Sequence, residues 1–285
     1  KGRGLSGETA KKFMIGYAPS EWEALCQQLG RNKEQKEQLV ELKLASEKSP
    51  GRQFDFFRDR LMFPIRDKRG RVIAFGGRVM QADQGPKYLN SPETRIFHKG
   101  FELYGLYEAK QAHKKLEHIL IVEGYMDVVA LAQHDIPHAA ATLGTATSTD
   151  HLRKIFRYCP QVMFCFDGDE AGRRAAVKAL ESALPTMEDG RSARFLFLDE
   201  GEDPDSLVRK LGSHGFERLM QEQSRSLEDF LFDSCNSGGD SLNERATLSK
   251  RAAPLIDKLP GRVFKELILE QLAQRRGLSS EALNK

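Results

Sequence analysis

The chain has 285 residues, of which 40% are hydrophobic and 30% are charged, the composition of an ordinary globular protein. This length predicts roughly one to three domains. Lysine and arginine exceed aspartate and glutamate by only 44 to 41, so the formal charge of +3 does not by itself indicate nucleic-acid binding. No run of about 18 apolar residues is present, which excludes a predicted membrane-spanning helix.

The amino-terminal residues and the cysteines indicate where the protein works. The chain begins without methionine, and its first residues, Lys-Gly-Arg-Gly-Leu-Ser, lack the apolar core of a signal peptide. We therefore expect an excised part of a longer protein. The four cysteines are scattered and include no Cys-x-x-Cys pair. This spacing indicates neither a disulfide framework nor a zinc site within the chain, and it favours a reducing cytoplasm.

The first stretch, residues 1–116, has a mixed pattern and is expected to form an α/β subdomain. Helices are expected over 6–13, 21–29 and 33–47. A hairpin is expected next, with strands at 61–65 and 72–75 and a charged turn between them. The segment 76–92 is rich in glycine, proline and asparagine and predicts turns.

The central stretch, residues 117–212, alternates short apolar runs with amphipathic segments. The runs span 119–122, 139–141, 162–166 and 195–198. Helices are expected between them, over 126–133, 149–157 and 171–184. Continuous apolar runs are typical of strands covered on both faces, as in a parallel sheet. This stretch therefore predicts an α/β domain in which helices connect parallel strands.

The last stretch, residues 213–285, shows only helical periodicity and predicts a helical bundle. Its helices are expected over 227–235, 242–259 and 263–277. The fold class expected for the whole chain is α/β, with a parallel sheet flanked by a mixed amino-terminal subdomain and this bundle.

Acidic residues follow three of the predicted parallel strands. Glu123 ends the first strand, Asp167 and Asp169 follow the third, and Asp203 and Asp205 follow the fourth. Because ligands of open parallel sheets bind beyond the carboxyl ends of the strands, we expect these carboxylates at one edge. Converging carboxylates repel one another unless a cation lies between them, and oxygen ligands favour Mg²⁺ or Mn²⁺.

Each acidic group alone has a simpler explanation. An Asp-x-Asp pair after a strand is often a turn followed by a helix N-cap. Three such groups at the ends of strands in one sheet favour a metal site instead. Asp127 is expected in the first turn of the next helix, where it either complements the helix dipole or belongs to the site.

Several motifs resemble one known family. The segments 121–128, 166–173 and 201–205, with sequences IVEGYMDV, FDGDEAGR and GEDPD, are similar to the toprim domain of DnaG-type bacterial primases. Toprim is an α/β fold shared by primases, some topoisomerases and some nucleases. The segments FPIRD (63–67) and PKYLNSP (86–92) resemble the amino-terminal subdomain of the primase core. The resemblance spans most of the chain and weakens in its last helices.

The resemblance implies an RNA polymerase that makes short primers on single-stranded DNA from ribonucleoside triphosphates. It implies Mg²⁺- or Mn²⁺-dependent nucleotidyl transfer in which Glu123, Asp167 and Asp169 are catalytic. The same three residues, together with Asp203 and Asp205, would bind metal. Whether Glu123 is a ligand or a general base stays open.

A nucleic-acid groove is also implied by the resemblance. The positions that match its basic and polar residues are Arg3, Arg78, Lys87, Tyr88, Asn90 and Lys99. From the residues alone, Lys87 and Tyr88 lie in a glycine- and proline-rich loop that displays side chains. There a lysine neutralises phosphate and a tyrosine stacks on a base. For any single lysine or arginine the alternative is a solvated surface charge.

Other functions remain as alternatives. The nearest alternative is a toprim nuclease, since a topoisomerase would need a tyrosine nucleophile on further domains that do not fit within 285 residues. A phosphatase that uses the Asp-x-Asp pair would leave Glu123 and the GEDPD segment unexplained, and a non-enzymatic nucleotide- or DNA-binding module is the third alternative. The resemblance further implies a zinc-binding module and a helicase-binding domain outside this chain, a monomer, and a place at the replication fork in the cytoplasm.

Overall fold

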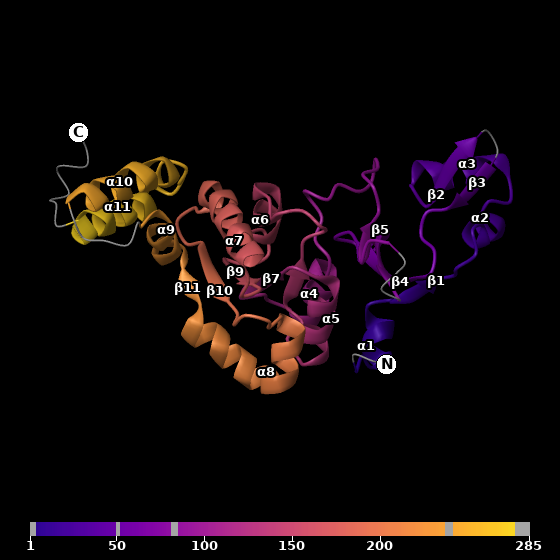
Figure 1. Ribbon diagram of the computed structural model, residues 1–285, viewed down its shortest axis with the longest axis horizontal. Coiled ribbons are helices and arrows are strands. Elements are labelled where there is room, and N and C mark those ends of the chain that lie inside the picture. Colours follow the sequence, from indigo (N-terminus) through magenta and orange to yellow (C-terminus); the bar gives the residue numbers. More distant parts are fainter. Residues whose placement is uncertain (1–3, 50–51, 81–84, 237–241, 277–285) are drawn as a thin grey trace.

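The computed structural model describes residues 4–49, 52–80, 85–236 and 242–276. The chain runs along an elongated molecule, with the amino-terminal elements at one end, a five-stranded sheet in the middle and the last helices at the other end (Figure 1). Within the described ranges, no helix is both long and apolar enough to cross a membrane.

An antiparallel sheet in the order β1-β4-β5-β6 lies beside the central domain. Its strands are β1 (Gly16–Ala18), β4 (Arg60–Arg66), β5 (Val72–Val79) and β6 (Tyr88–Asn90). The predicted hairpin is confirmed as β4 and β5. Its turn is closed by the Asp67 side chain, which accepts hydrogen bonds from the backbone N–H groups of Arg69 and Arg71.

β6 and the second half of β5 lie where the sequence predicted only turns. Glycine is uncommon in strands, but the one at position 76 has a packing reason. A Cβ atom at Gly76 would lie 2.4 Å from the ring of Tyr125, so the missing side chain makes room for that ring. The turn-rich composition therefore reflects close packing against the central domain.

A small outer unit precedes the hairpin. It contains α2 (Ala24–Leu29), α3 (Lys33–Glu41), β2 (Ala45–Ser49) and β3 (Arg52–Asp55), and α1 (Gly7–Lys12) lies apart from it. The prediction of one helix over 33–47 was wrong at its end. The helix stops at Glu41 because Lys43 has a φ of 58°, which turns the chain into the β2–β3 hairpin.

The central sheet confirms the predicted parallel α/β domain. Its order is β11-β10-β9-β7-β8, and all neighbouring pairs except β10–β11 are parallel. The strands are β7 (His118–Val122), β8 (Ala139–Ala141), β9 (Gln161–Phe166), β10 (Ser192–Phe197) and β11 (Arg225–Ser226). The four parallel strands coincide with the four apolar runs.

Helices cover both faces of this sheet, so successive strand residues enter two different cores. The helices on one face are α5 (Tyr125–Gln133) and α8 (Pro204–Gln223), and those on the other are α6 (Thr149–Ile155), α7 (Glu170–Ala183) and α9 (Leu227–Cys235). Ile121 of β7 packs with the α6–α7–α9 side, while Leu120 and Val122 pack with the α5–α8 side. Burial on both faces explains why the runs are continuously apolar.

The antiparallel sheet shares the core on the α5–α8 side. Phe63 of β4 stacks on Tyr125 of α5 with ring centroids 5.2 Å apart. A second contact lies at the edge of the parallel sheet, where the backbone of Tyr104 forms an antiparallel bridge with Ala141 of β8 through hydrogen bonds of 3.0 and 2.9 Å. The chain then continues into α4 (Leu106–Ala112).

The carboxyl-terminal region is helical, as predicted. α10 (Leu242–Ile256) and α11 (Arg262–Arg276) follow α9 and pack into the α6–α7–α9 core, and a short 3₁₀ helix, η1 (Leu184–Thr186), ends α7. The division into 1–116, 117–212 and 213–285 remains a prediction. Its second boundary falls inside α8, at Gly212, whose φ of 68° interrupts the helix.

Candidate active site

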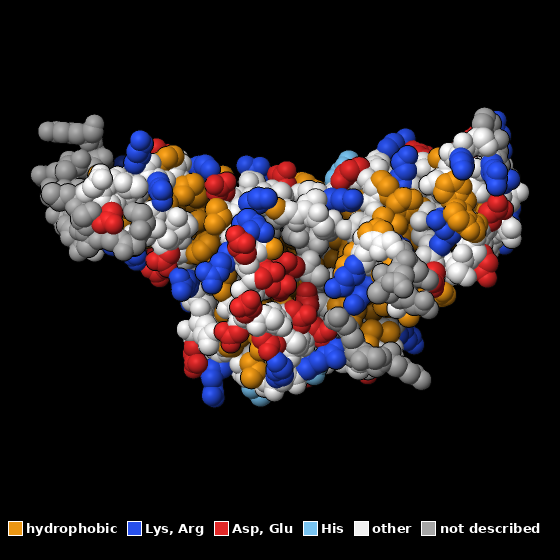
Figure 2. All heavy atoms as spheres, in the orientation of Figure 1, with side chains coloured by type: hydrophobic (Ala, Val, Ile, Leu, Met, Phe, Trp, Pro, Cys, Tyr) orange, Lys and Arg blue, Asp and Glu red, His pale blue; other side chains and the backbone are white. Residues whose placement is uncertain are grey.

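The predicted acidic residues lie at the carboxyl edge of the parallel sheet. Glu123 follows β7 directly, Asp167 and Asp169 follow β9, and Asp203 and Asp205 lie at the start of α8, after β10. Because β7, β9 and β10 are adjacent and parallel, their carboxyl ends meet at one edge. Figure 2 shows acidic side chains gathered in the middle of one face, with lysine and arginine side chains beside them.

The pKa shifts show that these carboxylates lie close enough to repel one another. Burial, and then the charges of Asp167 and Asp169, raises the pKa of Glu123. Burial, and then Asp203 and Asp169, raises the pKa of Asp167. Like charges disfavour ionisation of each partner, so the edge is under electrostatic strain that a cation would relieve.

Asp127 belongs to the same acidic group. It lies in the first turn of α5 and folds back over Gly124, and burial raises the pKa of its carboxyl to about 7, with Asp203, Asp167 and Asp205 adding to the shift. The sequence left two roles open for this residue. Its position among three other carboxylates favours membership of the site.

Two of the aspartates are also helix caps. Asp169 is the N-cap of α7, where its Oδ1 accepts a hydrogen bond of 2.7 Å from the N–H of Gly172. Asp203 caps α8 by accepting a hydrogen bond of 2.6 Å from the N–H of Ser206. Asp169 and Asp203 therefore cap helices and at the same time belong to the acidic group. In each case the cap fixes the backbone, and the aspartate has further lone pairs for a ligand.

The glycines of the FDGDEAGR segment allow this close packing. A Cβ atom at Gly172 would lie 2.2 Å from the backbone oxygen of Asp167, and one at Gly168 would lie 2.3 Å from the backbone oxygen of Leu198. Only glycine fits at these two points. The turn after β9 can therefore press against both α7 and the end of β10, which holds Asp167 and Asp169 at the sheet edge.

Asp205 differs from the other acidic residues. It is 3% exposed, and its Oδ1 accepts a hydrogen bond of 2.7 Å from Nε of Arg209, one turn further along α8. Its charge is thus partly neutralised by an ion pair. Asp169, in contrast, is exposed, and Glu123 is partly exposed although burial contributes to its raised pKa.

The donor set fits a hard divalent cation. All of the candidate ligands are carboxylates, which are the ligands that Mg²⁺ and Mn²⁺ prefer, and their mutual repulsion favours a bound cation. Within the residues that the structure describes, no three Asp, Glu, His or Cys side chains converge tightly enough to form a ready-made metal site. The side chains would have to draw closer around an ion.

The predicted nucleic-acid residues are partly brought together. Arg78 of β5 pairs with Tyr88 of β6, and its guanidinium lies 5.5 Å from the centre of the Tyr88 ring. Lys87 precedes Tyr88 and is exposed, and Lys99 lies in a separate loop between β6 and α4. Arg3 lies outside the described residues.

Asn90 has an internal role that the sequence did not suggest. Its Oδ1 accepts a hydrogen bond of 2.6 Å from the hydroxyl of Tyr125, and its Nδ2 donates one of 2.9 Å to the backbone oxygen of Leu143. The amide therefore ties β6 to α5 and to the loop after β8. The interpretation of Asn90 as a groove residue has to accommodate these two contacts.

Comparison with known proteins covers nearly the whole chain. Residues 1–110 match the family described as "DNA primase catalytic core, N-terminal domain", and residues 120–208 match "Toprim-like". A DNA primase of Pseudomonas putida is 52% identical over 284 residues, 99% of this chain and 43% of that protein. The chain thus spans less than half of the length of such curated relatives.

Two solved structures are similar to this one throughout. A DNA primase domain from Pseudomonas aeruginosa has a TM-score of 0.94 and 51% identity, and the match covers 98% of this chain and 88% of that one. A DnaG primase catalytic domain bound to ssDNA has a TM-score of 0.93 and 48% identity, with coverage of 99% and 88%.

The parallel sheet with its acidic carboxyl edge defines a toprim protein, a class that binds divalent metal. The similarity to the P. aeruginosa domain, together with the match of the amino-terminal subdomain, narrows the class to one family. The chain belongs to the DnaG-type bacterial DNA primases and corresponds to their catalytic core.

One expectation about partners requires correction. From the sequence alone, the helicase contact was expected outside this chain, and the last helices were expected to form only a bundle. Residues 229–281, which include most of α9 and all of α10 and α11, match the family described as "DnaB-helicase binding domain of primase". A surface for the helicase therefore has to be sought within this chain as well.

Proposed function

We propose that this chain is the RNA-polymerising core of a replicative primase and joins ribonucleotides on a single-stranded DNA template. The observation that carries the proposal is the group of carboxylates at the edge of the parallel sheet, beside the subdomain that bears Arg78, Lys87, Tyr88 and Lys99. The family membership and the similarity to a DnaG domain bound to ssDNA support the same function.

In the proposed reaction a 3′-hydroxyl attacks the α-phosphate of a ribonucleoside triphosphate, and pyrophosphate leaves. Glu123, Asp167 and Asp169 would hold a divalent cation, and Asp203 and Asp205 would complete the acidic site. When bound, Mg²⁺ or Mn²⁺ lowers the pKa of the attacking hydroxyl and neutralises charge on the phosphates. Glu123 is exposed and has a raised pKa, so general-base action remains a second role for it.

The amino-terminal subdomain would bind the nucleic acid and the nucleotide. Lys87 and Lys99 contribute positive charge that pairs with phosphates, and the ring of Tyr88 offers a face for a base, with Arg78 beside it. The family resemblance alone assigns Arg3 to the same proposed groove, and Asn90 belongs to it as the residue that joins its wall to α5. The +3 formal charge is compatible with this division because the acids gather at the metal site.

The proposal extends to partners and location. A template of single-stranded DNA, an RNA primer and ribonucleoside triphosphates are the substrates, and the replicative helicase is a partner through the region 229–281. We place the protein in the cytoplasm at the replication fork, as a monomer. The four cysteines, all free thiols, suit a reducing compartment.

The test is incorporation of labelled ribonucleotides on single-stranded DNA, with and without an annealed primer, in Mg²⁺ or Mn²⁺. The informative variant is Asp167→Asn combined with Asp169→Asn, because asparagine keeps the cap of α7 while removing both charges. Glu170→Gln is the matched control, since Glu170 is exposed, adjacent to Asp169 and paired only with Arg174 among the described contacts. We expect a product from the wild type and the control, and none from the double variant.

Other outcomes select other functions. Metal-dependent degradation of the template would support the nuclease, and release of phosphate from small phosphate esters would support the phosphatase. Metal-independent DNA binding without turnover, even from an annealed primer, would support the binding module.

A further inference from the structure

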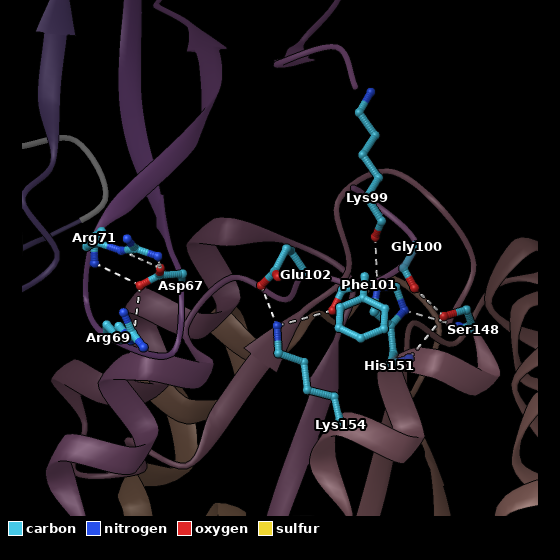
Figure 3. A network of polar contacts seen from close by, with 10 residues as sticks. All are labelled: Asp67, Arg69, Arg71, Lys99, Gly100, Phe101, Glu102, Ser148, His151 and Lys154. Atoms are coloured by element: carbon cyan, nitrogen blue, oxygen red, sulfur yellow. Dashed lines mark hydrogen bonds and ion pairs between the residues drawn. The ribbon is translucent and has the colours of Figure 1, made fainter. Parts of the chain in front are cut away.

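The backbone carbonyl groups of three successive residues, beginning with Lys99, accept hydrogen bonds from side chains of one helix. Nε2 of His151 lies 2.8 Å from the oxygen of Lys99, and Oγ of Ser148 donates a hydrogen bond of 2.6 Å to the oxygen of Gly100. Nζ of Lys154 donates one of 3.3 Å to the oxygen of Phe101. Ser148, His151 and Lys154 are spaced three residues apart, from the N-cap of α6 to its last turn, and lie on one face of the helix (Figure 3).

The loop needs these partners because of its own geometry. Residues 98–102 form a tight turn in which the N–H groups of Phe101 and Glu102 both bond to the oxygen of His98. The next three carbonyls point out of the turn, like the unpaired carbonyls at the end of a helix, and would be unsatisfied without α6. Glu93 holds the other side by accepting a hydrogen bond of 2.9 Å from the N–H of Lys99.

His151 is the central member of this contact. The side chain is fully buried, and its Nδ1 accepts a hydrogen bond of 3.1 Å from the N–H of Ser148. Nδ1 is therefore unprotonated, and the proton of the neutral ring is on Nε2, where it is donated to Lys99. Burial also lowers the pKa of His151, which keeps the ring neutral. One imidazole thus completes the cap of α6 and fixes the Lys99 backbone.

The contact spans two parts of the molecule. α6 follows β8 of the parallel sheet, whereas Lys99 lies in the chain between the antiparallel sheet and α4. The side chain of Lys99 extends away from α6, as Figure 3 shows, so its backbone is held while its ammonium group stays free of the contact. Lys154 strengthens the joint through an ion pair with Glu102, both side chains being largely buried.

We propose that Ser148, His151 and Lys154 are positioning residues that hold Lys99 against the catalytic domain so that its ammonium group meets a phosphate of the template or the nucleotide. His151 acts through Lys99 and touches no substrate itself. The identity of the phosphate rests on the proposed function, whereas the contact between α6 and the Lys99 loop is observed directly.

The test is a double-mutant cycle on template affinity and on KM and kcat. His151→Leu removes both hydrogen bonds of the ring. His151→Gln keeps both, since glutamine at this helix position accepts the cap hydrogen bond and its amide donates to Lys99. We expect His151→Leu to weaken binding of a labelled single-stranded oligonucleotide, or to raise KM, by about 5- to 10-fold with a smaller change in kcat. His151→Gln should stay within about twofold of the wild type.

The cycle separates positioning from simple stability. In a Lys99→Ala background, His151→Leu should have no further effect. In a Lys87→Ala background its effect should multiply, because Lys87 lies on a different loop. The inference would be overturned if His151→Leu weakened DNA binding by the same factor in the Lys99→Ala and Lys87→Ala backgrounds. It would also be overturned if His151→Gln bound the oligonucleotide as weakly as His151→Leu. Thermal midpoints of all variants show whether each is folded.

The two proposals fail in different ways. If the wild type binds the oligonucleotide but incorporates no ribonucleotide, the proposed function falls and the cycle is decided on DNA affinity alone. If the wild type incorporates ribonucleotides and Lys99→Ala has no effect on either readout, the positioning inference falls while the proposed function stands.

Discussion

The hydroxyl of Tyr125 donates a hydrogen bond of 2.6 Å to Oδ1 of Asn90, and the Tyr125 ring stacks on Phe63. Tyr125 comes two residues after Glu123 and opens α5. The wall of the proposed groove is therefore joined to the catalytic edge through a side chain almost adjacent to a candidate catalytic residue.

Tyr125→Phe tests this joint. The ring and its stacking remain, but Oδ1 of Asn90 loses its donor in a largely buried place, which should cost about 1–2 kcal/mol of stability. A lower thermal midpoint, measured by calorimetry, is the expected result. Asn90→Ala in the Tyr125→Phe background should add less than it does in the wild type. Independent effects of the two changes would mean that the hydrogen bond contributes little.

Two substitutions at Asp169 should distinguish its role as a helix cap from its proposed role in catalysis. Asp169→Asn retains the hydrogen bond to Gly172 and should change stability by less than about 0.5 kcal/mol, whereas Asp169→Ala should cost about 1 kcal/mol. Ribonucleotide incorporation should fall at least about 100-fold in both. Retained activity in Asp169→Asn would show that this aspartate serves only as a helix cap.

Divalent metal should stabilise the folded chain. Because the acidic site exists only in the folded chain, Mg²⁺ at about 100 times its Kd should add about 2.7 kcal/mol to the free energy of unfolding. In Asp167→Asn the metal-free protein should have a higher thermal midpoint than the wild type, and added Mg²⁺ should raise it less. Calorimetry at several Mg²⁺ concentrations measures both. An unchanged response to Mg²⁺ would remove Asp167 from the metal site.

The environment of two histidines far from the acidic edge predicts that the free energy of unfolding decreases in acid. The rings of His118 and His138 lie 4.5 Å apart beside a cavity of about 400 Å³, and the buried Nε2 atoms of both have no hydrogen-bond partner among the described residues. Burial lowers the pKa of His118, and burial followed by the His118 charge lowers that of His138 from 6.5 to about 4.

The sign of the effect follows from this depression. Below pH 6.5 the unfolded chain binds a proton at His138 that the folded chain refuses until about pH 4, so stability is full above 6.5 and is lost as the pH falls. Because solvent reaches part of the ring, we expect a loss of about 1 kcal/mol between pH 7 and 5 from His138. Urea unfolding at several pH values measures it. His138→Asn should flatten the dependence, and an unchanged slope would refute the assignment.

The sequence predicted the central sheet well because its strands are buried on both faces, and burial leaves a continuous apolar run. It failed where local composition and tertiary packing disagree. β2, with the sequence ASEKS, is polar and was read as the end of a helix. The second half of β5 was read as a turn because of its glycines, yet Gly76 is required there by the ring of Tyr125, which lies 49 positions further along the chain.

The placement of the acidic residues at one sheet edge could be predicted, whereas the contacts that hold the neighbouring loops could not. Strand ends are visible in a sequence, so the aspartates could be placed on one edge. The contact of His151 with Lys99 joins residues 52 positions apart, and no periodicity encodes it. A serine followed three residues later by histidine was the only local signal, and it indicates a helix start instead of a partner loop.

The short bridge between Tyr104 and Ala141 has a consequence for the protein in a crowded cell. β8 is an edge strand of three alanines, and exposed strand edges tend to recruit strands from other molecules. The bridge pairs the backbone N–H and C=O groups of Ala141, and the remaining edge of β8 is too short to pair with a strand of another molecule. The same contact that joins two parts of the chain thereby protects it against aggregation.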